Sequence, residues 1–139
     1  MYLQSFSITT LFAIITAAVA SIIIGMFWYH PRVFGGMWMR LSGLSPEMNE
    51  RARRGSTLYL IGGLMASMVA AYVLYWFGAF LSVYDWITAF ELSFWCWLGF
   101  TAPTMLNSVF WEQRPLGIYL INASYWLVSL TVMALILLI

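Results

Sequence analysis

The stretch PLGIYLINASYWLVSLTVMALILLI at residues 115–139 carries no charged side chain. Three further stretches share this character, because residues 1–29 and 55–84 are uncharged and residues 86–111 contain only Glu91. A helix needs roughly 20 apolar residues, at about 1.5 Å of rise each, to cross the hydrocarbon core of a bilayer. Continuous apolar runs of this length do not show the alternation of membrane β-strands. The sequence therefore predicts four transmembrane helices.

The composition also indicates a chain that lies almost entirely in lipid. Hydrophobic residues make up 63% of the 139 positions and charged residues 8%, which is too little polar surface for a soluble globule. We expect an all-α fold, a four-helix transmembrane bundle that forms one membrane domain over residues 1–139. The predicted spans are residues 7–28, 57–81, 86–109 and 116–138, and a cytoplasmic loop covers residues 29–56.

The basic residues set the expected orientation of these spans. With four spans, the loops after the first and third spans lie on one side, and they hold every basic side chain: Arg32, Arg40, Arg51, Arg53, Arg54 and Arg114. By the positive-inside rule this side is cytoplasmic, and both termini lie outside. The first apolar run has no basic residue before it and is too long for the core of a signal peptide, so we expect it to be retained.

The loop at residues 29–56 has features of its own. Pro31 is expected to end the first span, and residues 37–41 mix apolar and basic side chains as an interfacial segment does. Ser45-Pro46-Glu47 then predicts the start of a short helix, which ends near Arg54. On that helix three arginines are expected to contact lipid headgroups or an acidic partner protein: Arg51, Arg53 and Arg54. Nearby acidic residues argue against nucleic acid as a partner.

Two spans carry small residues at intervals of four, where a second backbone can approach closely. Such contacts drive helix association in lipid, where the hydrophobic effect between helices is weak. The first two spans are therefore expected to pack as a tight hairpin, although each stripe can instead face a second subunit. The helix-packing positions are Ala13, Ala17, Ser21 and Gly25 in the first span, and Gly62, Ala66 and Ala70 in the second.

Glu91 is the one ionisable side chain well inside a predicted span. It lies about 9 Å beyond Asp85 along a helix. A carboxyl group at this depth is costly unless it is paired, protonated or in contact with water, so Glu91 is a candidate proton or ion site. The alternative is a protonated glutamate that hydrogen-bonds a neighbouring helix. The other polar residues of this span fall on the opposite helical face, which weakens the transport interpretation.

Two further polar pairs lie toward the cytoplasmic side. Asn107 and Asn122 are at similar depths on consecutive antiparallel spans, so we expect them to bond to each other or to backbone freed by Pro103. Glu112 and Arg114 lie in the turn between those spans and are expected to pair with each other or with nearby basic residues. An exposed pair of this kind contributes little to stability.

No constellation of residues indicates catalysis or a bound cofactor. The sequence has no plausible Ser/His/Asp trio, no metal-ligand spacing, no phosphate-binding glycine loop followed by lysine, and no lysine at all. A haem held by two histidines is excluded because His30 is the single histidine. We therefore expect a protein that is not an enzyme, and the sequence identifies no metal or cofactor. Trp95 and Trp97, which lie deeper than the interfacial aromatic residues, could flank a bound lipid, pigment or quinone.

The run from Gly25 to Met39, GMFWYHPRVFGGMWM, resembles the N-terminal signature of the DUF1761 family of small bacterial membrane proteins. Later segments that resemble the family's motifs are WLGF at 97–100, FWEQRP at 110–115 and INASY at 121–125. The resemblance implies a four-helix fold in the bacterial inner membrane and no known activity. It also implies a motif site near the cytoplasmic face, formed by Trp28, Tyr29, Pro31, Gly35, Trp38, Glu112, Arg114, Pro115 and Asn122.

Together these features favour a non-enzymatic membrane protein that acts by helix–helix association. It would form a homo-oligomer or serve as an accessory subunit of a larger membrane complex, surrounded by membrane lipids. The alternative is a small oligomeric transporter or channel for a proton, ion or small solute, which uses Glu91 or the cytoplasmic polar cluster.

Overall fold

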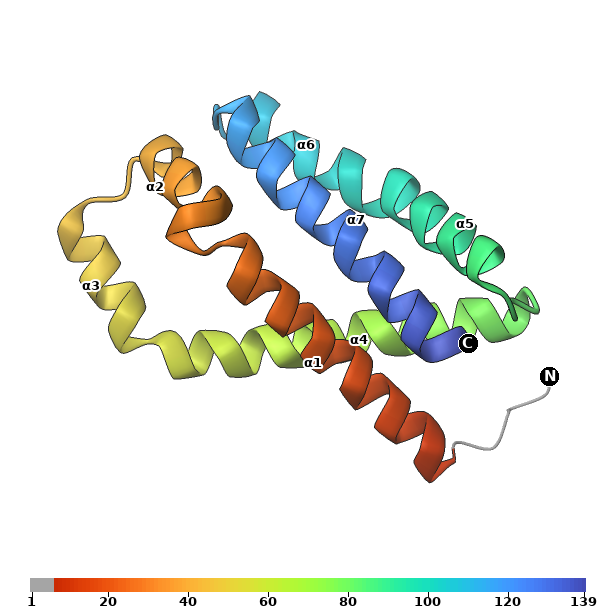
Figure 1. The fold of residues 1–139 in the computed structure, drawn as a ribbon. Helices are drawn as coiled ribbons and strands as arrows, with labels where there is room; N and C mark the ends of the chain where they lie inside the picture. Colours follow the sequence, from red (N-terminus) through yellow and green to blue (C-terminus); the bar gives the residue numbers. More distant parts are fainter. Residues whose placement is uncertain (1–6) are drawn as a thin grey trace.

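The computed structural model describes residues 7–139, apart from the side chains of Pro46, Asn49, Ala52 and Arg53. Within this part of the chain all regular structure is helical (Figure 1). The elements in chain order are α1 (Ile8–Trp28), η1 (Pro31–Gly35), α2 (Gly36–Ser42), α3 (Pro46–Arg54), α4 (Ser56–Phe80), α5 (Trp86–Cys96), η2 (Trp97–Thr101), α6 (Ala102–Phe110) and α7 (Leu116–Leu138). The two η elements are π-helical turns.

Three helices are long and apolar enough to cross a membrane: α1, α4 and α7. Their bounds agree with the predicted spans at residues 7–28, 57–81 and 116–138 to within one residue. The structure thus confirms an all-helical chain with helices suited to a membrane. The span predicted at residues 86–109 is not one helix, because it is divided among α5, η2 and α6.

Pro103 explains why this third apolar run is interrupted. A proline inside a helix donates no backbone hydrogen bond, and its ring clashes with the carbonyl four residues earlier, which here belongs to Gly99. The π-helical turn η2 lies at this place, and the backbone N–H of Ala102 donates to the carbonyl of Trp97, five residues back. The widened turn relieves the clash and lets the chain continue into α6.

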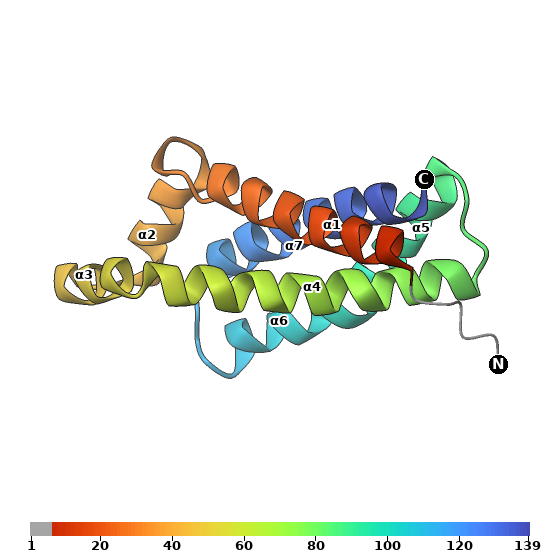
Figure 2. The ribbon, with the colours of Figure 1, turned by 90° about the horizontal axis from the view of Figure 1, so that it is seen from below.

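Helix α7 lies at the centre of the molecule and packs against α1, α4 and α5. Figures 1 and 2 show α7 between α1 and the α5–α6 segment, with α4 crossing them on one side. The core contains apolar residues from all four segments, and Met133 of α7 is fully buried in it. Helices α1 and α4 also pack directly against each other, as expected of the first two spans, whereas α5 is held mainly by α7.

Small and hydroxyl-bearing residues line the contact between α1 and α7. Ala17 and Ser21 of α1 are fully buried, Ala13 packs beside the core, and Gly25 lies so close to Tyr125 that a Cβ would be 3.4 Å from its ring. The hydroxyl of Ser21 bonds that of Ser129 at 2.9 Å. The small-residue stripe of the first span therefore packs within the chain, where close approach favours association.

The stripe predicted in the second span lies elsewhere. Gly62 and Ala66 are exposed, and nothing lies within 4 Å of a Cβ built on Gly62. The buried face of α4 is a neighbouring one, formed by Ser67, Ala71, Leu74 and Gly78. Gly62 and Ala66 thus do not line a contact within the chain, and the alternative, that this stripe faces a second subunit, stays a prediction. Adjacent positions of α4 offer two small-residue stripes about 100° apart.

The connection before α5 is fixed by a helix cap. One carboxylate oxygen of Asp85 accepts from the backbone N–H groups of Ile87 at 2.9 Å and Thr88 at 3.0 Å. Hydrogen bonds from Thr88 are the main reason that the pKa of Asp85 lies below its usual value. A capped start of this kind defines where α5 begins.

Candidate functional site at the arginine-bearing end

The connector from α1 to α2 is the first component of the site. Helix α1 ends at Trp28, Pro31 starts η1, and the backbone N–H of Gly35 donates to the carbonyl of His30 at 3.1 Å. A Cβ on Gly35 would stand 2.0 Å from the carbonyl oxygen of Tyr29, which is closer than any real contact. Only glycine fits at position 35, and this close turn directs α2 back toward α7.

Tyr29 contacts three residues that the sequence places far apart. Its hydroxyl donates to Oδ1 of Asn122 at 2.7 Å. Its ring meets Trp38 edge-on at 6.3 Å between centroids and Tyr125 at 5.5 Å. Burial is the main cause that raises the pKa of Tyr29 above its usual value, with a smaller contribution from Tyr125. The hydroxyl therefore remains a neutral donor at any physiological pH.

Two indole rings hold α7 from different neighbours. Trp28 at the end of α1 donates through Nε1 to the carbonyl of Ile121 at 3.0 Å. Trp97 of η2 donates to the carbonyl of Ala123 at 2.7 Å. Both acceptors lie within one turn of α7, next to Asn122. Trp28, Tyr29 and Trp97 thus fix the same turn of α7 to two other segments.

The expected pair of asparagines is not formed. Asn122 accepts from Tyr29, whereas Asn107 is exposed on α6. The expectation used depth along the spans, and depth alone does not determine which side chains of two helices meet. The partner of Asn122 comes instead from the connector after α1.

The turn between α6 and α7 forms the second component of the site. The Nε of Arg114 lies 3.0 Å from a carboxylate oxygen of Glu112, and both side chains are more than half exposed. This confirms the expected pair between them. Gln113 adopts a left-handed backbone with φ of 56° and donates through Nε2 to the carbonyl of Phe110 at 2.7 Å. Pro115 then precedes the first residue of α7.

Helix α2 packs against the start of α7. A Cβ on Gly117 would stand 2.6 Å from Cδ1 of Leu41, so the two helices are in close contact there. This contact brings the connector after α1 and the turn before α7 to the same end of the molecule.

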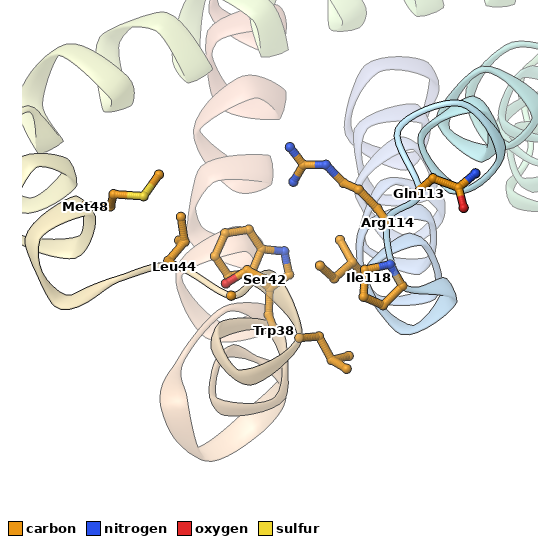
Figure 3. A pocket seen from close by; sticks show the side chains of 10 residues that line it. Trp38, Ser42, Leu44, Met48, Gln113, Arg114 and Ile118 are labelled. Atoms are coloured by element: carbon orange, nitrogen blue, oxygen red, sulfur yellow. The ribbon is translucent and has the colours of Figure 1, made fainter.

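A pocket of about 340 Å³ lies between these two components (Figure 3). Its walls come from α2, the start of α3, and the α6–α7 turn. They are formed by Trp38, Leu41, Ser42, Gly43, Leu44, Met48, Gln113, Arg114, Pro115 and Ile118. The indole Nε1 of Trp38 is buried and has no hydrogen-bond partner. Sequence reasoning placed Trp38 and Arg114 in one motif set, but nothing in the sequence indicated a cavity between them.

A family model described as "Protein of unknown function (DUF1761)" matches residues 12–138, nearly the whole chain. The chain belongs to the DUF1761 family. No curated protein and no solved structure matches it. The resemblance predicted from the motif residues is therefore confirmed, and the family description assigns no activity.

The DUF1761 motif residues divide between the two components of the site. Trp28 ends α1, and Trp38 lies on α2. Between them, the connector contains Tyr29, Pro31 and Gly35. The others lie in the α6–α7 turn or on α7: Glu112, Arg114, Pro115 and Asn122. Tyr29 links the two sets through Asn122. Trp97, from the WLGF segment, also contacts this turn of α7, although it was not among the predicted site residues.

The remaining candidate residues of this DUF1761 chain do not line the pocket. Glu91 is exposed on α5. Arg51 and Arg54 are exposed on α3, and the predicted lipid contact of the Arg53 side chain lies outside the described residues. Among the residues that the structure describes, no group of three or more His, Cys, Asp or Glu side chains can hold a metal ion.

Proposed function

We propose that this protein is a non-enzymatic, four-span protein of the bacterial inner membrane that acts by helix–helix association. It forms a homo-oligomer or is an accessory subunit of a larger membrane complex, in contact with membrane lipids and without a nucleic-acid partner. The exposed carboxyl group of Glu91, in a segment otherwise suited to lipid, is the observation that carries the proposal.

The fourth span in this proposal is the α5–η2–α6 segment. These three elements follow one another without a gap from residue 86 to residue 110. At about 1.5 Å per residue the segment is about 37 Å long, which exceeds the roughly 30 Å hydrocarbon thickness of a bilayer. The first residues of α1 and the last of α7 lie toward one end of the molecule, opposite α2 and the α6–α7 turn (Figure 1). An even number of spans accounts for this arrangement, with the arginine-bearing end cytoplasmic and both termini outside.

Glu91 supports association because the single chain offers it no polar surroundings. Its neighbours on the same face of α5 are Ile87 and Trp95, which are 51% and 65% exposed. A carboxyl group facing hydrocarbon costs roughly 2.5 kcal/mol or more, even on the scale derived from membrane insertion. A second helix that covers this face and forms a hydrogen bond with the carboxyl group reduces that cost.

Helix α4 supports association through a different feature. Residues 56–62 at its start are exposed, and Gly62 and Ala66 form a short small-residue stripe beside the exposed side chains of Leu58 and Met65. A partner helix can approach such a surface closely in lipid. The stripe that α1 does not cover is therefore available to a second protein chain.

The test is the mass of the complex in native-membrane nanodiscs, with identification of every chain that co-purifies. We expect Glu91→Leu to weaken assembly by about tenfold, because one interhelical hydrogen bond in lipid contributes about 1–2 kcal/mol. Glu91→Gln should retain assembly, since glutamine has nearly the same size and can still form an interhelical hydrogen bond. Gly62→Leu should also weaken assembly, whereas Gly62→Ala should not.

Ile87→Leu is the matched control for Glu91→Leu, because it changes an apolar residue on the same face of α5. An unchanged mass and dissociation constant for both Glu91→Leu and Gly62→Leu would reject association through these surfaces. A stable foreign chain in the wild-type complex would identify an accessory subunit. A complex of identical chains would identify a homo-oligomer.

A small transporter or channel is the second candidate. The exposure of Glu91 favours a form of it in which the ion site lies between chains. An ion site on this residue must be formed between chains, because Glu91 faces outward from its own helices. Glu91→Gln distinguishes the two candidates in proteoliposomes. Under the transport candidate this substitution abolishes proton or ion flux and leaves assembly intact, whereas wild-type protein without flux rejects transport.

A further inference from the structure

The outer face of the α5–η2–α6 segment carries polar groups that the chain does not pair. Glu91 and Asn107 are exposed, and Trp95 is 65% exposed. Within the part of the chain that the structure describes, no hydrogen bond engages any of these three side chains. Glu91 and Trp95 lie inside the proposed span and Asn107 lies close to its cytoplasmic edge. Hydrocarbon offers no hydrogen-bond partner, so the groups inside the span need one from outside the chain.

The π-helical turn η2 brings Asn107 to the same side of the segment as Glu91. On a straight helix the two residues are about 160° apart, which is why the sequence placed them on opposite faces. A π-helical turn contains one extra residue, so it rotates the following helix back by about 100° and leaves Asn107 about 60° from Glu91. The exposure of residues 91, 95, 99, 103 and 107 agrees with a single outer stripe.

Gly99 lies at the middle of this stripe. It is eight residues from Glu91 and eight from Asn107, or about 12 Å along the helix in each direction. It is exposed, and a Cβ built on it meets nothing within 4 Å. Trp95 stands one turn before it, with most of its ring uncovered. The stripe therefore combines a bare backbone, where a second helix can come close, with a large side chain that can fill the adjacent space.

We propose that this stripe is the contact between two copies of the chain, related by a twofold axis along the membrane normal. The inference rests on the homo-oligomer form of the proposed function and assigns its interface. Such an axis makes the two α5–η2–α6 segments parallel and places each residue at the depth of its own copy. Helix α7 covers the inner side of the segment, so the outer side is open to the second copy (Figure 1).

The unpaired groups of the stripe complement themselves. The indole N–H of Trp95 only donates, and the carboxyl group of Glu91, one turn away, accepts. In a twofold contact each Trp95 donates to Glu91 of the other copy, and the bond forms twice. The amide of Asn107 both donates and accepts, so it pairs with Asn107 of the second copy, as buried asparagines do in parallel coiled coils. A second copy thus supplies every missing partner at the matching depth.

The first test is oxidative cross-linking in native membranes, where all copies share one orientation. The background is Cys96→Ala, which removes the single cysteine. A disulfide forms only when the two Cα atoms lie within about 7 Å, so Gly99→Cys and Asn107→Cys should each give a covalent homodimer. Phe100→Cys is the matched control. Phe100 is 68% exposed at nearly the same depth as Gly99, but it points about 100° away around the helix.

The second test measures the dimer dissociation constant in liposomes by energy transfer between labelled copies. Trp95→Phe keeps the ring and removes the donor, and it should raise the dissociation constant about tenfold, as should Glu91→Leu. Because both variants break the same bond, the double variant should weaken dimers little more than either one. Trp111→Phe is the control, since Trp111 is 83% exposed in the α6–α7 turn and should leave the constant unchanged.

The outcomes separate this interface from association in general. A complex of identical chains without cross-links at positions 99 and 107, or with equal cross-linking at position 100, overturns the interface and leaves the proposed association intact. Additive effects of Trp95→Phe and Glu91→Leu overturn the hydrogen bond between copies. A complex with a foreign chain and no self-cross-link shows that a different protein covers the stripe. A monomer in native membranes rejects both the interface and the proposed function.

Discussion

Gly35→Ala should remove most of the folded protein. The added Cβ would stand 2.0 Å from the carbonyl oxygen of Tyr29 and 2.9 Å from the carbonyl carbon of His30. Both are backbone atoms of the same tight connector, so no side-chain rotation relieves the overlap. Moving the backbone would also break the bond from Gly35 N–H to the carbonyl of His30. We expect a cost of at least about 3 kcal/mol, beyond the usual range for overpacking.

Alanine substitutions at two other glycines should have smaller effects on stability and serve as comparisons. A Cβ on Gly36 would lie 2.8 Å from the carbonyl oxygen of Pro31, which requires a smaller shift. A Cβ on Gly62 meets nothing within 4 Å, and alanine there should stabilise α4 by up to about 1 kcal/mol. The unfolding temperature measured by circular dichroism, and the monodisperse fraction in detergent, should be highest for Gly62→Ala, lower for Gly36→Ala and lowest for Gly35→Ala. An unfolding temperature of Gly35→Ala within a few degrees of Gly62→Ala would contradict the prediction.

The positions of the helices were predictable because hydropathy and helix-breaking residues determine them locally. The uncharged run that ends at residue 29 and the proline at 31 define the end of α1, which the structure places at Trp28. Ser45-Pro46-Glu47 similarly predicted the start of α3, where the hydroxyl of Ser45 accepts from the backbone of Met48 at 3.3 Å. The division of the third apolar run was only partly foreseen. Pro103 indicates that the helix is distorted near this residue. It does not indicate that the distortion takes the form of a π-helical turn.

The choice of packing face was not predictable from periodicity. In α4 one small-residue stripe runs through Gly62 and Ala66, and the next runs through Gly63, Ser67 and Ala71. Both repeat every four residues, so both satisfy the pattern for close helix contact. Only the approach of Ile22 to Gly63, and the burial of Ser67 and Ala71, select the second stripe. That selection depends on the tertiary structure as a whole.

The sequence predicted which residues form the site, but not which of them contact each other. The family resemblance identified Tyr29, Trp38, Arg114 and Asn122 together. It did not indicate that Tyr29 bonds Asn122, because helix depth favoured Asn107 as the partner of Asn122. The unpaired N–H of Trp38 had no signal in the sequence at all, since any tryptophan near a helix end is equally typical of the membrane interface.

The second large effect is expected at Tyr29. Tyr29→Ala removes the hydrogen bond to Asn122 and the ring contacts with Trp38 and Tyr125, and it leaves a cavity between the connector and α7. We expect a loss of about 3–5 kcal/mol in the free energy of unfolding. Tyr29→Phe keeps the rings and removes one hydroxyl, so a loss of about 1–2 kcal/mol is expected, measured by reversible unfolding in mixed micelles.

A double-mutant cycle with Asn122→Leu isolates the hydrogen bond from the ring contacts. Each single substitution leaves one polar group unpaired, whereas the double variant Tyr29→Phe with Asn122→Leu leaves neither. The loss in free energy of unfolding of the double variant should therefore be smaller than the sum of the losses of the two single variants, by about 1 kcal/mol. Tyr84→Phe is the control, because Tyr84 is 74% exposed and should change the free energy of unfolding little.

The pH dependence supplies an independent check on the role of the Tyr29 hydroxyl. Burial raises the pKa of Tyr29 in the folded state, so the contribution of its neutral form is complete below the unfolded-state pKa of about 10 and is lost as pH rises above it. The difference between wild type and Tyr29→Phe should therefore stay constant from about pH 5 to pH 9. A difference that shrinks within that interval, or additive effects in the cycle, would show that the hydroxyl does not hold α7 to the connector as a neutral donor.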